Sequence, residues 1–171
     1  SITGVQQHSF ACPKIATNQT LYIGNITNNN AVVKISAPSL KSITVTGSAV
    51  VSARNFNTSG LTVVAENQGT INLEGRFDIK QISQFGNGRI NIDWIDTSAL
   101  NIDGHGSGPV YLAGRVDNLQ IKLTSSAKLY ARYLRTQKAY VFTTDHALAE
   151  VMVLDNLGAY QRWFGYQPNT K

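Results

Sequence analysis

The feature that most constrains the fold is a set of residue columns that recur along the chain in steps of 20, 19, 20, 19 and 20 residues. A second column starts at Val51 and a third at Ala53, and both are apolar throughout; a fourth, from Ala49, contains only Gly or Ala. A register that is constant over six repeats predicts that equivalent residues stack directly above one another. The first column contains only β-branched apolar residues: Ile43, Val63, Ile82, Ile102, Ile121 and Val141.

Within each repeat, apolar and polar residues alternate over two short stretches that are separated by polar turns. This alternation is typical of β-strands with one buried face, and the abundance of Val, Ile, Thr, Tyr and Gly agrees with an all-β chain. We expect a right-handed parallel β-helix, or solenoid, of about seven coils with repeats of ~20 residues. A weaker first copy would place Ile23, Ala31 and Val33 one period ahead of the apolar columns. A β-sandwich is the alternative fold, which the fixed register disfavours.

The length of 171 residues indicates one structural unit in three segments. Residues 1–20 do not follow the period and are expected to form an N-terminal cap or lead-in, residues 21–156 the solenoid, and residues 157–171 a C-terminal cap or a docking segment. The docking alternative depends on a dense aromatic group around one arginine, a composition typical of interface hot spots. Its members are Tyr160, Arg162, Trp163, Phe164 and Tyr166.

The glycine-rich stretch NIDGHGSGPVYLAG at residues 101–114 has the composition of a ligand-binding loop. A phosphate loop requires a following helix, however, and the next residues alternate as a strand. We therefore interpret the stretch as one turn of a coil. His105 and His146 lie in neighbouring turns with Asp residues nearby, which leaves a metal site as an alternative, but we expect no metal and no cofactor. Cys12 is the single cysteine, so the sequence contains no cysteine-rich zinc site.

Catalysis is not expected, and no catalytic residue is assigned. The alternative is a glycan-active enzyme, because Glu74 and Asp93 share a column and glycosidic cleavage requires two carboxyl groups held close together. Arg54 falls in the same column one coil before Glu74, so an outward salt bridge between them explains the pattern equally well.

The charge pattern allows an anionic partner, although an ordinary, mildly basic solvated surface also explains it. The formal net charge is +5 and the pI about 9.4, but the basic residues are scattered, so nucleic acid is not expected. Lys128, Tyr130 and Arg132 would point outward together from one strand and form a candidate interaction patch. The expected partners are proteins of the cell envelope or an anionic glycan.

The stretches ITVTGSAVVSA, INIDWIDTSALNIDGHGSGPVYLAGRVDNLQIKLTSSAKLYARYLRT and AYVFTTDHALAEV resemble the head-GIN domains of auto-transporter adhesin-like bacterial envelope proteins. The resemblance covers roughly residues 20–156. It implies a non-enzymatic scaffold or adhesin-like module in the bacterial periplasm or at the cell surface. An accessory subunit of a larger envelope complex, such as a secretion system, is the alternative. No apolar run reaches the ~18 residues of a transmembrane helix.

Overall fold

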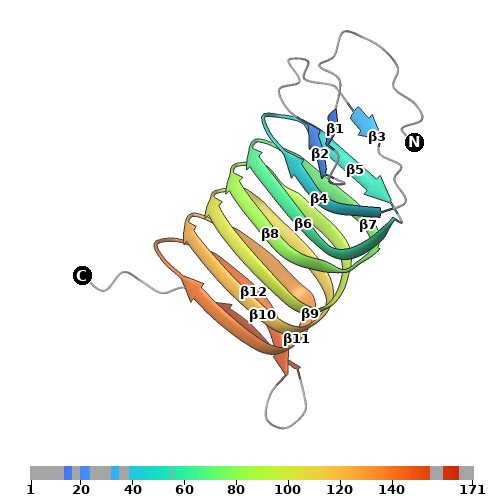
Figure 1. Ribbon diagram of the computed structural model, residues 1–171. Helices are drawn as coiled ribbons and strands as arrows, with labels where there is room; N and C mark the ends of the chain where they lie inside the picture. The colour runs from blue at the N-terminus through green and yellow to red at the C-terminus, as the bar shows by residue number, and fades with distance from the viewer. Residues whose placement is uncertain are drawn as a thin grey trace.

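The computed structural model describes residues 14–16, 20–23, 32–34, 39–54, 56–154 and 160–165. These residues contain strands and turns and no helix, and the strands stack as the coils of a β-solenoid (Figure 1). The expected fold class is therefore confirmed, with about six turns. The described part of the chain contains no helix of the length and hydropathy needed to span a bilayer.

The strands belong to one continuous sheet, because the longest of them run around a corner of the coil. Their bounds are β1 Lys14–Ala16, β2 Thr20–Ile23, β3 Val32–Lys34, β4 Ser39–Val45, β5 Val50–Arg54, β6 Asn57–Asn67, β7 Thr70–Phe77, β8 Ile79–Gly86, β9 Ile90–Gly106, β10 Pro109–Ser125, β11 Lys128–Thr143, β12 Leu148–Leu154 and β13 Tyr160–Gly165.

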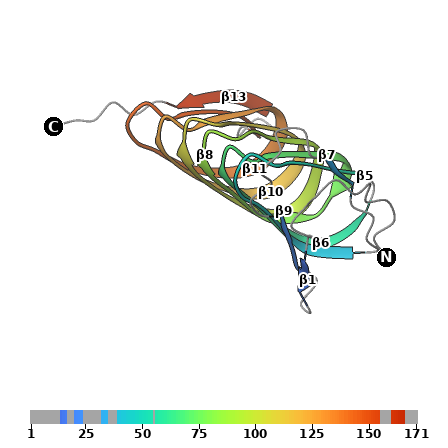
Figure 2. The same cartoon turned by 90° about the horizontal axis from the view of Figure 1, so that it is seen from above.

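Two layers of parallel strands enclose the core (Figures 1 and 2). Layer 1 consists of β2, β4, β6 and β8 followed by the C-terminal parts of β9, β10 and β11. Layer 2 consists of β3, β5 and β7, the N-terminal parts of β9, β10 and β11, and then β12. Each coil therefore contributes one strand to each layer, and outward side chains of successive coils form rows on two outer faces.

The strand register follows the sequence columns. In layer 1, Ile43 pairs with Val63, and the pairing continues in the same column to Val141. In layer 2, the column that starts at Val51 continues without a break to Ala149. Side chains of both columns point into the core, where Ile43 and Val51 are fully buried. Each buried Ile, Val or Leu contributes about 1.5–3 kcal/mol relative to an exposed one.

At the first coil, the register differs from the expectation. Ile43 pairs with Leu21 rather than with Ile23, and Val51 pairs with Val33 rather than with Ala31. The predicted weaker copy is therefore present, but its strands are shifted by two residues. A shift of two residues preserves which side chains face inward, because side chains alternate along a strand with a period of two.

One turn column also differs from the expected register. Thr97 and Thr136 both pair with Val116, so Asp117 lies one residue beyond the column in which the sequence steps placed it. Side chains of this corner bind backbone groups of adjacent coils. The Asp78 amide donates to Thr58 Oγ1 at 2.8 Å, and the Gly60 amide donates to Asp78 Oδ2 at 3.0 Å.

The glycine-rich stretch forms a corner of the stack, as expected. Gly106 has φ +130°, and a Cβ on Gly108 would lie 1.9 Å from the carbonyl oxygen of Gly88 in the preceding coil. Glycine is therefore required at Gly108 by the close approach of two backbones. The stretch is a structural turn that closes the coil.

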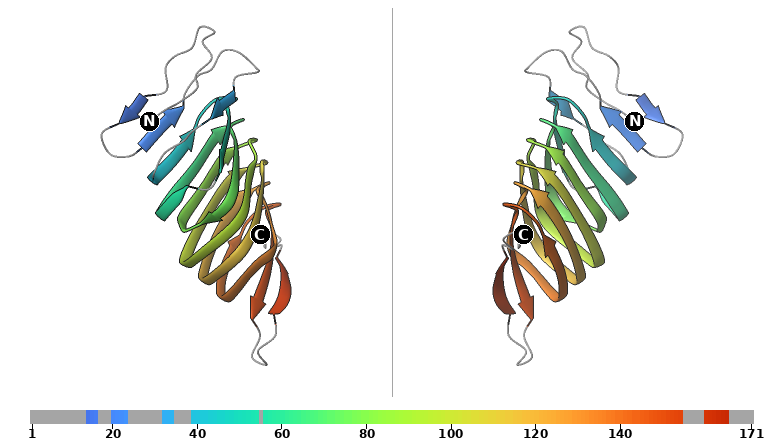
Figure 3. Two further views of the ribbon diagram at one scale, coloured as in Figure 1. Left: turned by 90° about the vertical axis from the view of Figure 1, so that its right-hand side faces the viewer. Right: turned by 90° about the vertical axis from the view of Figure 1, so that its left-hand side faces the viewer.

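The two ends of the described stack carry antiparallel strands. β1 pairs with β2 at the N-terminal end, and this hairpin projects from the stack (Figure 3). At the other end, β13 pairs with β12 from Ala149↔Gly165 to Leu154↔Tyr160. The backbone of β13 thereby occupies the edge that β12 would otherwise leave open.

Candidate functional site

The outer face of layer 2 presents two stacked tyrosines on adjacent coils. Tyr111 and Tyr130 are register partners in β10 and β11, and their ring centroids lie 5.0 Å apart with an interplanar angle of 16°. The same row contains Asn72 and Asn91 before the tyrosines, where Asn91 Nδ2 donates to Asn72 Oδ1 at 2.6 Å, and Glu150 after Tyr130. Because the coil spacing fixes the distance between neighbouring residues of a row, the two rings are held at stacking distance by the backbone itself.

Three basic side chains lie near these rings. The guanidinium of Arg89 lies 5.5 Å from the centroid of the Tyr111 ring, which is 39% exposed. Lys128 and Arg132 are exposed and alternate with the buried residues Leu129 and Ala131, so they point outward on the same side as Tyr130. We call the surface formed by Arg89, Tyr111, Lys128, Tyr130, Arg132 and Tyr133 the tyrosine patch.

Tyr133 belongs to the patch although strict alternation would turn it inward. The β10–β11 register shifts between the pairs Tyr111↔Tyr130 and Ala113↔Tyr133, so β11 contains one extra residue at this corner. Such a bulge redirects the following side chain. Tyr133 is 61% exposed as a result, and the Arg132 guanidinium lies 4.8 Å from its ring centroid. Sequence alternation identified Arg132 but could not identify Tyr133 or Arg89.

The candidate carboxylate pair of a glycan-active enzyme lies beside a bulge, and one of its members is already in an ion pair. Arg54 Nε contacts Glu74 Oε2 at 2.7 Å, so Glu74 is held in an ion pair, as the alternative interpretation expected. The β7–β9 register shifts after Leu73↔Ile92, and Asp93 has no direct register partner in β7. Glu74 and Asp93 therefore do not form one continuous column.

His105 belongs to a polar cluster on the outer face of layer 1. Its Nδ1 lies 2.5 Å from Thr124 Oγ1, its Nε2 lies 3.1 Å from Asp103 Oδ1, and its ring stacks on Phe85 with centroids 5.6 Å apart. Among the residues that the structure describes, no group of three or more His, Cys, Asp or Glu side chains could hold a metal ion. His105 is thus accounted for by contacts between coils.

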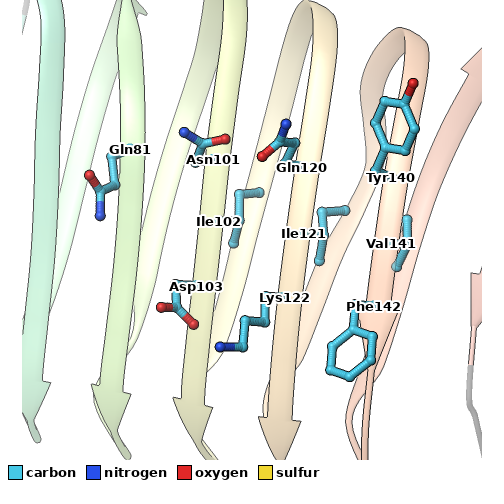
Figure 4. Close-up of a pocket in the computed structure, with 10 residues that line it drawn as sticks. All are labelled: Gln81, Asn101, Ile102, Asp103, Gln120, Ile121, Lys122, Tyr140, Val141 and Phe142. Carbon is cyan, nitrogen blue, oxygen red and sulfur yellow. The ribbon is translucent and has the colours of Figure 1, made fainter.

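A second surface feature lies on layer 1 and was not identified from the sequence. It is a hollow of about 480 Å³ formed by the outer faces of four successive coils. Two rows of side chains cross it (Figure 4). A regular signal was available, because these residues follow the same steps of 20, 19 and 20 residues as the buried columns. We call this hollow the amide groove; its side chains are Gln81, Asn101, Asp103, Gln120, Lys122, Tyr140 and Phe142.

The aromatic residues of the C-terminal segment are placed only in part. The backbone of Tyr160, Arg162, Trp163 and Phe164 lies in β13, which pairs with β12. Their side chains and the whole of Tyr166 lie outside the described residues. A docking role of residues 157–171 stays a prediction.

A closed stack of parallel strands with long, regular outer faces defines the class of β-solenoid proteins, in which the outer rows are available for contacts with other molecules. Residues 14–162 match the family described as "Putative auto-transporter adhesin, head GIN domain". The chain belongs to this family, as its resemblance implied. Searches of curated proteins and of solved structures give no match.

Proposed function

We propose that this chain is a non-enzymatic, adhesin-like module of the bacterial cell envelope, which binds an anionic partner through the tyrosine patch. Two observations support this assignment. The family description is that of an adhesin head domain. The outer face of layer 2 gathers three aromatic rings and three cations on a rigid framework.

The observation that carries the proposal is the Tyr111–Tyr130 stack with a cation at one end and two further cations beside it. Aromatic rings provide contact area at low conformational cost, and Tyr and Arg dominate interface hot spots. The surrounding positive charge would attract carboxylate or sulfate groups and raise the association rate. An acidic protein surface and an anionic glycan both present such groups.

A binding experiment with two anionic probes tests the proposal and separates the two sources. Hexagalacturonate represents an anionic glycan, and hexaglutamate represents an acidic peptide. We expect the chain to bind at least one of them, with affinity that decreases as salt is added because charges on the surface are screened. The double variant Lys128→Ala/Arg132→Ala should reduce this affinity at least tenfold.

Lys41→Ala provides the matched control, because Lys41 is also exposed but lies on β4 in layer 1. This variant should bind within twofold of the unmodified chain. Equal affinities of the control and the double variant would contradict the proposal, as would the absence of binding to both probes at low salt.

A further inference from the structure

The amide groove is organised as two parallel rows with one residue from each coil. In the first row, the register partners Gln81, Asn101, Gln120 and Tyr140 follow one another across β8, β9, β10 and β11 (Figure 4). Two residues further along the same strands, the second row continues through Asp103, Lys122 and Phe142. Both rows end in an aromatic residue on the same coil.

The amides of the first row are available to a ligand. The side chains of Asn101 and Gln120 are exposed and have no hydrogen-bond partner among the described residues, whereas Gln81 Nε2 donates to Ser83 Oγ at 3.3 Å. A side-chain amide offers both donors and an acceptor. It can therefore bind two neighbouring hydroxyl groups of one ligand at the same time.

The aromatic end of the groove is unusually open. Tyr140 is 68% exposed and Phe142 is 52% exposed, although both lie on the same strand face. Neighbouring apolar side chains that are exposed together indicate a contact surface, whereas single exposed residues scattered over a surface do not. A ring of this kind can stack on the apolar face of a sugar.

The charge of the groove differs from that of the tyrosine patch. Its ionisable side chains are one carboxylate, Asp103, and one ammonium, Lys122, and the Lys122 side chain extends toward Asp103 (Figure 4). The two opposite charges cancel, so the groove gives no preference for a charged ligand.

The inner strands of the groove do not offer the most common mode of peptide binding. An extended peptide gains affinity on a sheet by pairing with the main chain of an edge strand. Residues 101–106 of β9 are already paired with β8 on one side and with β10 on the other. Recognition over β9 and β10 must therefore come from side chains, which favours a ligand rich in hydroxyl groups.

We propose that the amide groove binds a linear, uncharged oligosaccharide that runs across the coils. The coil spacing of about 4.8 Å is close to the length of one sugar unit in an extended chain, so each coil can contact one unit. The amides bind ring hydroxyls along the chain, and Tyr140 and Phe142 stack on the unit at one end. This site is separate from the tyrosine patch in position, charge and ligand class.

The test measures the affinity of the chain for cellohexaose, maltohexaose and chitohexaose by isothermal titration calorimetry. We expect at least one of these hexamers to bind, with an affinity that does not change with ionic strength because the ligand is uncharged. With shorter chains of that sugar, affinity should increase up to four units and change little beyond, since four coils line the groove.

Variants locate the binding. Gln120→Ala and Tyr140→Ala should each reduce the affinity at least tenfold. Thr62→Ala is the matched control, because Thr62 lies in the same row on a coil outside the groove. Thr62→Ala and the tyrosine-patch variant Lys128→Ala should both bind within twofold of the unmodified chain.

The outcomes are distinct from those of the proposed function. Failure of all three hexamers to bind would overturn this proposal while leaving binding of anionic probes to the tyrosine patch unaffected. Sugar binding that persists in both groove variants would also overturn it. Hexaasparagine serves as an uncharged peptide probe. If it binds while the three sugar hexamers do not, and Gln120→Ala abolishes this binding, the groove binds a peptide and the proposal is also overturned.

Discussion

At the scale of single residues, the stack depends on positions where adjacent coils approach each other too closely for a side chain. A Cβ on Gly88 would lie 2.0 Å from the carbonyl oxygen of Gly69, and a Cβ on Gly108 would lie 1.9 Å from that of Gly88. The same column contains Ala127 and Ala147, both buried, in later coils. The requirement for glycine is therefore confined to coils in which the turn backbones come closest.

The substitution Gly108→Ala tests this close approach. We expect it to lower the free energy of unfolding by about 1–3 kcal/mol or more, because overpacking forces the backbone to shift. Chemical denaturation followed by circular dichroism measures the change. Ala127→Gly, in the same column, should cost about 1 kcal/mol or less. A Gly108→Ala variant as stable as the unmodified chain would contradict so close a contact between the two coils.

Gln84 is a buried polar residue whose side chain forms hydrogen bonds with the backbone of a turn. It is 1% exposed, and its Nε2 donates to the carbonyl oxygens of Gly86 at 2.9 Å and Gly88 at 3.0 Å. Hydrophobic residues occupy several other positions of its inward column, such as Val45 and Leu123. Gln84 therefore adds a side-chain donor to these carbonyls, and the Gly86 carbonyl also accepts from the backbone amides of Ser107 and Gly108.

Removing this donor should destabilise the fold. We expect Gln84→Ala to lower the free energy of unfolding by about 1–3 kcal/mol, because the buried Gly88 carbonyl loses its side-chain donor and a cavity is left in the core. The neighbouring Ser83→Ala removes only a 3.3 Å contact with Gln81 and should cost less. Thermal or urea denaturation of both variants measures these losses of stability. A larger loss of stability for Ser83→Ala than for Gln84→Ala would contradict the prediction.

At the scale of the elements, β10 and β11 are joined by side chains as well as by backbone hydrogen bonds. The Tyr111–Tyr130 stack links the two strands on the outer face of layer 2. A double-mutant cycle with Tyr111→Ala, Tyr130→Ala and both together should give a coupling energy of about 0.5–1.5 kcal/mol. Additive effects of the two substitutions would show that the rings do not stabilise each other.

The strand β13 limits how a docking role of the C-terminal segment can be tested. Deleting residues 157–171 would remove the strand that pairs with β12, so lost binding could reflect an exposed sheet edge. Trp163→Ala keeps the backbone of β13. If the segment docks, this variant should lose captured envelope proteins in a pull-down while its unfolding midpoint stays close to that of the unmodified chain; an unchanged set of captured proteins would contradict docking.

Much of the architecture could be predicted from the sequence because buried columns repeat the same chemistry. Ile, Val and Leu recur where the core requires them, so the strand register is visible without a structure. The left-handed turn positions are less visible, because Asn67, Ser125 and Asp145 adopt a positive φ, as Gly106 does. Non-glycine residues adopt φ values near +60° there and Gly106 adopts +130°, so no single residue type marks these turn positions.

The candidate sites were harder to predict for two physical reasons. Bulges at the corners shift the alternation by one residue, which exposes Tyr133 and displaces Asp117 from its expected column. The rows of the amide groove change chemistry from coil to coil, since solvent-facing positions have no common packing requirement. Lys128 and Tyr130 could be predicted because they lie on a regular part of β11, and Arg132 could be predicted because alternation still holds at the start of the bulge.

At the scale of the whole molecule, each coil contacts mainly the coils before and after it, so the stack should tolerate removal of one complete repeat. Deleting residues 82–101 joins Gln81 to Ile102. Ile102 is the register partner of the deleted Ile82, so it takes the same inward position in the shortened strand. We expect this variant to fold with reduced stability and a strand-rich circular dichroism spectrum.

Deleting residues 82–100 is the control, because Asn101 would then take the inward position of Ile82. A one-residue slip turns every following inward side chain of that strand outward. This variant should unfold at a much lower denaturant concentration or fail to fold. Equal stability of the two deletions would contradict a stack that is fixed by one register.

The regular spacing of the coils also has an evolutionary consequence. An outward residue can change without disturbing the core, because its neighbours in the row belong to other coils. Mutation can therefore alter the surface at one position along the stack while the adjacent positions keep their chemistry. The outer faces of this protein can therefore diversify one coil at a time, while the packed interior continues to set the distance between coils.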